Sequence, residues 1–150
     1  MKIIDLKKEE FFIEQYVNLR NSYVKLLLTL PVSISETKEW LKRNDIEIRG
    51  FVQDNLLLGV VILYLNRDSE IAFFVKYPKK GIGSKLLKII EKVAKEKNLK
   101  SIWAWVRKDN LIAQHVFEKN GFVKEGISKK RYNTVIKLGI KYKKLMENLH

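Results

Sequence analysis

The sequence predicts an α/β domain with a mixed, mostly antiparallel sheet flanked by helices, and three observations carry this prediction. Two apolar segments flank the turn Asp54-Asn55, a pattern typical of a β-hairpin. A strand, a glycine loop and an amphipathic helix follow one another over 70–97. The 150 residues, 46% of them apolar, suffice for one core, so we expect a single domain over 1–150.

The N-terminal elements follow from the spacing of apolar residues. Residues 2–6 predict a short first strand, and 8–19 predict a helix because their apolar residues recur at helical spacing. Residues 18–25 fit either a continued helix or an irregular connection. A second helix is expected over 37–43, with Ser33 or Ser35 before it as its N-cap.

The middle of the chain predicts three antiparallel strands in sequence. The hairpin strands are 46–53 and 56–65, and the third strand is 70–75. Residues 56–65 are apolar on both faces, which indicates a strand in the centre of the sheet.

The remaining elements complete an α/β pattern. The helix after the glycine loop presents apolar residues on one face and lysines on the other, and Asn98 is a candidate cap near its end. A right-handed crossover then makes the strand 99–106 parallel to the strand 70–75. A short helix over 110–118 and two last strands, 122–127 and 133–146, follow.

The loop before the long helix has the chemistry of an anion site. Gly81 and Gly83 have no side chain, so the backbone can approach a ligand, and the helix start supplies free N–H groups and a positive dipole end. The order Gly83-Ser84-Lys85 does not fit a P-loop, and Leu86 stands where a dinucleotide fingerprint needs its third glycine.

The net charge of +13 is concentrated in one half of the chain. Residues 1–70 hold 10 Lys or Arg and 11 Asp or Glu, whereas residues 71–150 hold 20 and 6. A field of this sign would help to capture a ligand with several phosphates. Most of these lysines also fit a solvated surface, and nucleic-acid binding is the rival interpretation, which requires aromatic residues interleaved with the basic ones.

Three motifs in order resemble the GNAT superfamily of N-acetyltransferases. They are the Gly-x-Gly of the loop, the Asn-x-x-Ala that begins at Asn110, and the Phe-Glu-x-x-Gly-Phe that begins at Phe117. The resemblance is clear over 70–126. It implies a GNAT-like acyltransferase fold with splayed central parallel strands, and acetyl-CoA as the cosubstrate.

The resemblance also implies where acetyl-CoA binds. Its pantetheine arm would lie between the parallel strands, on the main chain of Phe73, Phe74 and Val75, whose side chains also suit a core. The loop would hold the pyrophosphate through Lys79, Lys80, Gly81, Ile82, Gly83 and Ser84.

Several matched positions qualify this picture. Asn110 fits a contact to the cofactor arm or a helix cap, and Ala113 leaves space beside it. Many members have a tyrosine acid where this chain has Phe117, which cannot donate a proton. Pro78 replaces the family's basic or amide residue, for which Lys79 or Lys80 would substitute as point charges.

The reaction implied is direct attack of an amine on the thioester, aided by positioning and a main-chain donor. Glu70 matches the family's commonest location for a carboxylate base, so the resemblance makes it the candidate base, although it also fits a surface strand residue. Tyr132 is the candidate acid, with Tyr77 behind it. Trp105 stands where relatives that acetylate protein N-termini have a glutamate, which argues against that substrate class.

The acceptor itself is open: a small molecule, an amino-sugar nucleotide or a protein amine. Asn21, Tyr23 and Trp40 fit either acceptor contacts or ordinary packing. His115 fits a surface or packing role, and no spacing of His and carboxylates predicts a metal site.

Two other functions stay open, namely an RNA- or ribosome-binding module on a degenerate GNAT fold and an acyl-CoA sensor without catalysis. A homodimer is also compatible with the sequence. The chain has no cysteine, no apolar run of membrane-spanning length and no signal-peptide pattern, so we expect a cytoplasmic protein.

Overall fold

The computed structural model describes residues 2–24, 30–78, 80–132 and 135–147. The strands are β1 (Lys2–Asp5), β2 (Ile46–Gln53), β3 (Leu56–Tyr64), β4 (Glu70–Val75), β5 (Ser101–Arg107), β6 (Val123–Tyr132) and β7 (Val135–Leu145). The α-helices are α1 (Ile13–Asn21), α3 (Ile34–Trp40), α4 (Ile82–Glu96) and α5 (Leu111–Lys119), and the 3-10 turns are η1 (Leu6–Lys8), η2 (Glu10–Phe12) and η3 (Leu65–Arg67).

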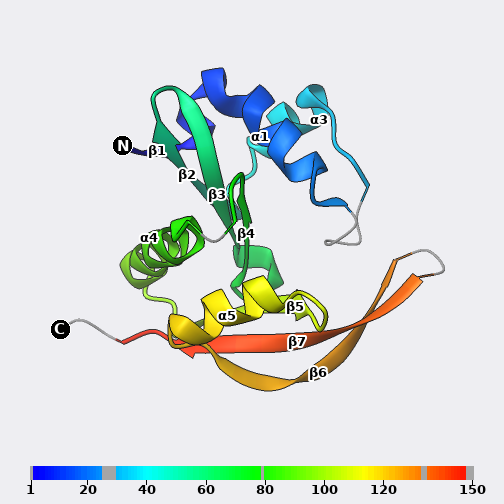
Figure 1. Ribbon diagram of the computed structural model, residues 1–150. Coiled ribbons are helices and arrows are strands. Elements are labelled where there is room, and N and C mark those ends of the chain that lie inside the picture. The colour runs from blue at the N-terminus through cyan, green and yellow to red at the C-terminus, as the bar shows by residue number, and fades with distance from the viewer. Residues whose placement is uncertain (1, 25–29, 79, 133–134, 148–150) are drawn as a thin grey trace.

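The seven strands form one sheet with the order β1-β2-β3-β4-β5-β7-β6 (Figure 1). All neighbours are antiparallel except β4 and β5, which run parallel. In the described chain, β4 and β5 register at one position, Glu70 with Trp103, and diverge beyond it. This is the α/β fold with splayed central strands that the sequence predicts.

Two separate cores lie on the two faces of the sheet. One core contains α4 and Phe117 of α5, packed on alternate residues of β3, β4 and β5. The other contains α1 and the residues around η1 and η2, packed on the opposite face of β2, β3 and β4. Strand β3 is buried along nearly its whole length, which confirms its predicted central place.

Local chemistry explains several element boundaries. Asp54 and Asn55 both adopt positive φ angles of 51° and 61°, the conformation that a two-residue hairpin turn requires. The Oγ of Ser33 accepts a hydrogen bond from the N–H of Glu36, so Ser33 is the N-cap of α3. Asn98 has a φ of 58° after α4, as expected of a residue that ends a helix.

Three predicted boundaries differ from the structure. The first helix begins as two 3-10 turns and becomes α-helical only at Ile13. Helix α3 begins at Ile34 rather than at 37, because Ser33 provides the cap. Strand β6 continues to Tyr132, well past the predicted end at 127, because the hairpin ladder with β7 extends through the basic residues 129–131. Lysines are tolerated there since β6 is an exposed edge strand.

Within the described residues, every helix is too short or too polar to traverse a lipid bilayer.

Candidate functional site

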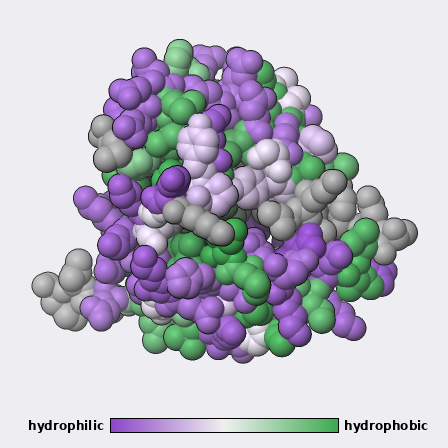
Figure 2. All heavy atoms as spheres, viewed as in Figure 1, coloured by the Kyte–Doolittle hydropathy of each residue, from purple (hydrophilic) through white to green (hydrophobic). Residues whose placement is uncertain are grey.

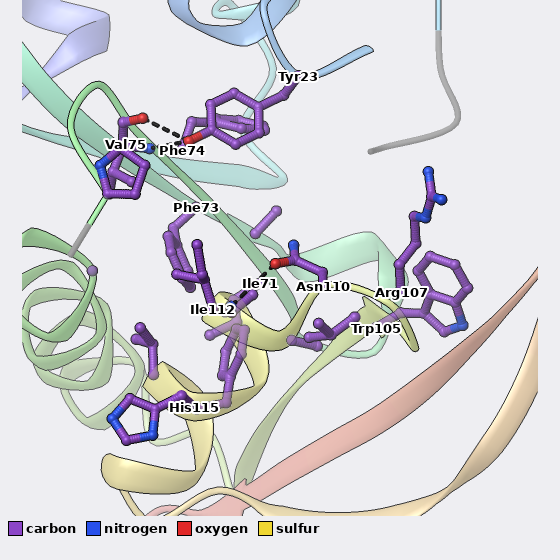
Figure 3. Close-up of a pocket in the computed structure, with 18 of the residues that line it drawn as sticks. Tyr23, Ile71, Phe73, Phe74, Val75, Trp105, Arg107, Asn110, Ile112 and His115 are labelled. Carbon is purple, nitrogen blue, oxygen red and sulfur yellow. Dashed lines mark hydrogen bonds between the residues drawn. The ribbon is translucent and has the colours of Figure 1, made fainter. Parts of the chain in front are cut away.

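A large cleft opens where β4 and β5 part (Figure 3). Its volume is about 920 Å³, and its walls come from the end of α1, strand β4, the start of α4, strand β5 and helix α5. The cleft is therefore a direct result of the splayed parallel pair, because strands that no longer pair leave room and unsatisfied backbone groups between them.

Strand β4 turns alternate main-chain groups toward this cleft. The N–H of Lys76 bonds the carbonyl of Leu58, so by alternation the N–H and C=O of Phe74 point to β3. The same alternation turns Phe73 and Val75 toward the gap. A main-chain contact at Phe74, expected from the sequence, is therefore not available, because that backbone is engaged by β3.

Tyr23, just beyond α1, already uses the free edge of β4. Its hydroxyl donates a hydrogen bond of 2.6 Å to the carbonyl of Val75, and the N–H of Val75 points back to the same oxygen at 3.4 Å (Figure 3). Burial raises the pKa of Tyr23 more than the bond to Val75 lowers it. Tyr23 thus occupies main-chain groups that the predicted pantetheine arm would need.

The start of α4 presents unpaired N–H groups. Gly81 is the N-cap with a φ of 76°, a conformation that L side chains rarely adopt, and no side chain caps the helix. A Cβ built on Gly81 meets nothing within 4 Å, so this glycine faces open space. In the described chain, no backbone carbonyl accepts from the N–H groups of Ile82, Gly83 or Ser84.

The next residues have packing roles as well. A Cβ on Gly83 would lie 3.2 Å from both Phe73 and Val116, so this glycine lets α4 approach β4 and α5 closely. The Oγ of Ser84 accepts a hydrogen bond of 2.9 Å from the Nδ2 of Asn120, at the end of α5. The Ile82 side chain is buried in the core, which leaves only its main chain for a ligand.

Helix α5 forms the opposite wall. The Oδ1 of Asn110 accepts from the N–H of Ala113, so Asn110 is the N-cap of α5. This bond satisfies one interpretation of Asn110 and leaves its NH₂ group for another partner. Leu111 and Ile112 are largely exposed, and Figure 2 shows hydrophobic residues gathered over α5 amid hydrophilic ones.

Phe117 lines the inner end of the cleft and is only 3% exposed. Its ring packs against Phe73, Phe122 and Tyr142, with centroid distances of 5.3, 5.0 and 5.7 Å. Phenylalanine at this position therefore serves the core as well as the cleft.

The other end of the cleft is polar and charged. The Glu70 carboxylate, with a side-chain exposure of 13%, lies 3.5 Å from Arg67, whose guanidinium stacks on the ring of Tyr64 at 4.2 Å. Glu70 and Tyr64 are cross-strand partners, which brings these three side chains together. Arg20 of α1 and Lys130 of β6 complete this end of the cleft.

The remaining candidates are placed unevenly. Lys79 and the side chain of Tyr132 lie outside the described residues, and Lys80 is exposed beside the start of α4. Tyr77 lines the cleft and is 47% exposed. His115 lies on the rim (Figure 3). In the part of the chain that the structure describes, no cluster of three His, Asp or Glu residues could hold a metal ion.

Two residues that line the cleft belong to no recognisable motif. They are Tyr64 and Arg67, which reach the cleft only through strand pairing and the turn before β4. Tyr23 and Trp105 were visible, but only the fold places both on the cleft.

A family model described as the Acetyltransferase (GNAT) family matches residues 13–122. A search of curated proteins returns no match.

Solved structures share the fold over nearly the whole chain. A ribosomal-protein-alanine N-acetyltransferase from Brucella melitensis is 17% identical, with a TM-score of 0.83 and coverage of 97% of this chain and 99% of that one. A spermidine N-acetyltransferase from Vibrio cholerae, solved with CoA and spermine, is 19% identical, with a TM-score of 0.80 and coverage of 97% and 95%. A Salmonella typhimurium protein solved with acetyl-CoA is 12% identical, with a TM-score of 0.84 and coverage of 100% and 96%. At these identities the likeness establishes the fold.

Proposed function

This chain belongs to the GNAT acetyltransferase family, and from that premise we propose that it transfers an acetyl group from acetyl-CoA to a primary amine by direct attack. Acetyl-CoA supplies the acyl group as an activated thioester. The protein then has to hold the thioester, bring the amine to it and accept the proton that the amine loses.

One observation carries this proposal: the open start of α4 and the edge of β4 that parts from β5 line the same cleft. The N–H groups of Ile82, Gly83 and Ser84, with the helix dipole, suit the pyrophosphate. The backbone of Phe73 suits an amide of the pantetheine arm, because it points into the gap. A Cβ at Gly81 would meet nothing within 4 Å, which leaves room for a pyrophosphate beside these N–H groups.

Glu70 is the proposed base. Its carboxylate lies at the polar end of the cleft, which we propose as the acceptor end. There it can take up a proton from the attacking amine directly or through water. Arg67 holds the carboxylate at 3.5 Å and so fixes its orientation. As the amine nitrogen bonds to the acetyl carbon, the carbon–sulfur bond breaks and the CoA thiolate departs.

No tyrosine stands at position 117 to protonate that thiolate, because Phe117 is a core residue with no ionisable group. A thiolate is a tolerable leaving group near neutral pH, since a free thiol has a pKa of about 8.5. We therefore assign no acid to Phe117 and expect the thiolate to leave unaided or with a proton from water.

The test has a binding stage and a kinetic stage. Acetyl-CoA should raise the melting temperature by mass action, and CoA thiol release should depend on an added amine. The amines tested are glucosamine, glucosamine 6-phosphate, spermidine and a lysine-containing peptide. Glu70→Gln should keep the melting shift and lower kcat by about a hundredfold with whichever amine reacts.

If acetyl-CoA does not raise the melting temperature of the wild-type protein, then the protein does not bind the cofactor and the proposal is wrong. A shift without thiol release from any amine would leave the sensor that the sequence also allows. Equal kcat values for Glu70→Gln and wild type would show that Glu70 is not the base and that another group accepts the proton.

A further inference from the structure

The strands β5, β7 and β6 carry an open, basic sheet face. Together they contain nine lysines and arginines and a single acidic residue, Glu125. The core formed with α1 includes no residue of these strands, so the face opposite α5 is not covered as it is in β2, β3 and β4. We call this surface the basic face, and define it by Trp103, Trp105, Lys130, Lys137, Lys141 and Lys143.

Two tryptophans on β5 give the basic face a fixed floor. The indole N–H of Trp103 donates to the carbonyl of Arg67 at 3.1 Å, and that of Trp105 donates to the Oγ of Ser128 at 3.1 Å. A Cβ on Gly139 would lie 2.1 Å from the Trp105 ring, so the ring lies directly on the backbone of β7. Both indoles are thereby held in one orientation and remain partly exposed.

Lysines lie over these rings. The Nζ of Lys141 is 4.8 Å from the Trp103 centroid, and the Nζ of Lys130 is 5.1 Å from the Trp105 centroid. Glu125 lies at 3.8 Å from Lys141 and 3.9 Å from Lys143, so one carboxylate is shared by two ammonium groups. The four lysines of the basic face therefore keep a clear excess of positive charge.

The basic face is continuous with the acceptor end of the cleft. A shallow second cavity of about 280 Å³ lies over it, lined by Trp103, Trp105, Lys130 and Lys141. Glu70, Trp105 and Lys130 line both this cavity and the main cleft. A molecule whose amine reaches Glu70 can thus rest its other end on the two tryptophans and their lysines.

We propose that the basic face binds the phosphate of the acceptor, so that the substrate is a primary amine borne by a phosphorylated molecule. The inference rests on the proposed acetyl transfer and names its substrate class. The phosphate lies between Lys130 and Lys141, and the amine points to Glu70.

Charge decides between classes of acceptor. A polyamine or a lysine-rich peptide would meet repulsion from this surface. A single carboxylate would be neutralised by one cation and is best matched by the fork of an arginine, whereas the cations of the basic face are lysines. A phosphate monoester carries about −1.5 to −2 charges at pH 7, which matches several lysines presented as point charges.

The test compares matched amines. Glucosamine 6-phosphate should have a kcat/KM at least about tenfold above that of glucosamine, and the ratio should fall as salt is added. Glycine against glycinamide tests a carboxylate in place of the phosphate, and spermidine tests a cation. Intrinsic tryptophan fluorescence, titrated with glucosamine 6-phosphate, reports binding without turnover.

Two double variants locate the effect. Lys130→Glu with Lys141→Glu should abolish the preference for glucosamine 6-phosphate and its fluorescence change. Lys88→Glu with Lys92→Glu makes the same change of charge on the exposed face of α4 and should leave both intact. Replacing Lys130 and Lys141 by Gln should give an intermediate loss.

Each other outcome overturns the proposal. Two of these outcomes are equal kcat/KM values for glucosamine and glucosamine 6-phosphate, and a higher kcat/KM for spermidine. A third is a preference for glycine over glycinamide without any preference for the phosphorylated sugar. The fourth is a preference for glucosamine 6-phosphate that persists in Lys130→Glu with Lys141→Glu. A single-stranded RNA oligonucleotide that binds through Lys130 and Lys141, with no preference among amines, would assign the face to nucleic acid. The melting shift with acetyl-CoA is independent of all these readouts, so its loss marks failure of the transferase proposal instead.

Discussion

The two halves of the sheet differ in what covers them. Strands β2 to β4 are covered by α4 on one face and by α1 with its neighbours on the other, and the two cores leave β3 almost wholly buried. Strands β5 and β7 contribute to the α4 core on one face only, and β6 is exposed throughout its described side chains. The first half is therefore suited to hold the fold, and the second is free to meet ligands.

Charge follows the same division. Strands β1 to β4 hold two basic and three acidic residues, whereas strands β5, β6 and β7 hold nine basic residues and one acidic residue. Charged side chains are costly to bury unless paired, so a strand covered on both faces excludes them. A face exposed to solvent accepts charged side chains, and β6 and β7 accordingly contain many lysines. The cleft lies on the seam between the two halves.

The largest expected effect separates the halves by stability. Leu86 on α4 is fully buried against β3, and Leu86→Ala should lower the free energy of unfolding by about 3 kcal/mol, through lost burial and a residual cavity. Leu145→Ala, in β7 at 73% exposure, should change it by less than about 0.5 kcal/mol. Urea denaturation measures both. Similar losses for the two variants would contradict the division.

The second effect concerns the cleft itself, at the start of α4. Gly81→Asp puts a negative charge and a side chain where the pyrophosphate is proposed to rest, and should weaken acetyl-CoA binding at least about tenfold. Calorimetry with acetyl-CoA measures the change.

Gly81→Asn is the matched control, because asparagine tolerates a positive φ and is neutral. It should bind acetyl-CoA much more tightly than the aspartate variant does. Equal weakening in both would assign the effect to backbone strain and not to charge.

A smaller effect concerns the contact of Tyr23 with the edge of β4. Tyr23→Phe removes the hydroxyl that occupies Val75, so the pantetheine arm no longer competes for those main-chain groups. Acetyl-CoA should bind about three- to fivefold more tightly, since one hydrogen bond contributes about 1 kcal/mol. Tyr77→Phe, also on the cleft, should leave the affinity unchanged. Weaker binding in Tyr23→Phe would mean that the hydroxyl contacts the ligand.

The smallest effect lies in the covered half. Burial alone would raise the pKa of Glu47, but hydrogen bonds from Lys97 and Arg49 outweigh it and hold the pKa below its ordinary value of 4.5. A carboxylate with a lowered folded-state pKa stabilises the protein above its unfolded pKa, and this contribution is lost as the pH falls through the folded pKa.

Wild type should therefore lose more stability than Glu47→Gln on acidification below about pH 5, by less than about 1 kcal/mol. Urea midpoints at a series of pH values measure the difference. Parallel curves for the two proteins would show that the ion pairs add nothing.

Local signals were enough to predict most of the fold. Apolar periodicity, the Asp54-Asn55 turn and the glycine loop placed the hairpin, the crossover and the parallel pair, because each depends on residues close in sequence. Strand β6 was predicted too short because a run of lysines does not resemble a strand. In an exposed hairpin the ladder supplies the stability that side-chain burial does not.

The site was less accessible to sequence reasoning. Tyr23 meets Val75 across 52 positions, and Tyr64 meets Glu70 only through strand register. Gly83 was predicted for its approach to a ligand, but its missing side chain is also required by Phe73 and Val116. Such demands come from packing between distant segments, which no local pattern encodes.

The parting of β4 from β5 creates sheet edges in the interior of the molecule, and an uncovered edge is a template on which foreign strands can assemble into aggregates. The phenol of Tyr23 caps the outer end of the β4 edge, and α5 stands along the gap. We expect the protein to resist fibril formation at this edge as long as Tyr23 and α5 cover it. The Tyr23 side chain would then protect the solubility of the protein while no ligand is bound.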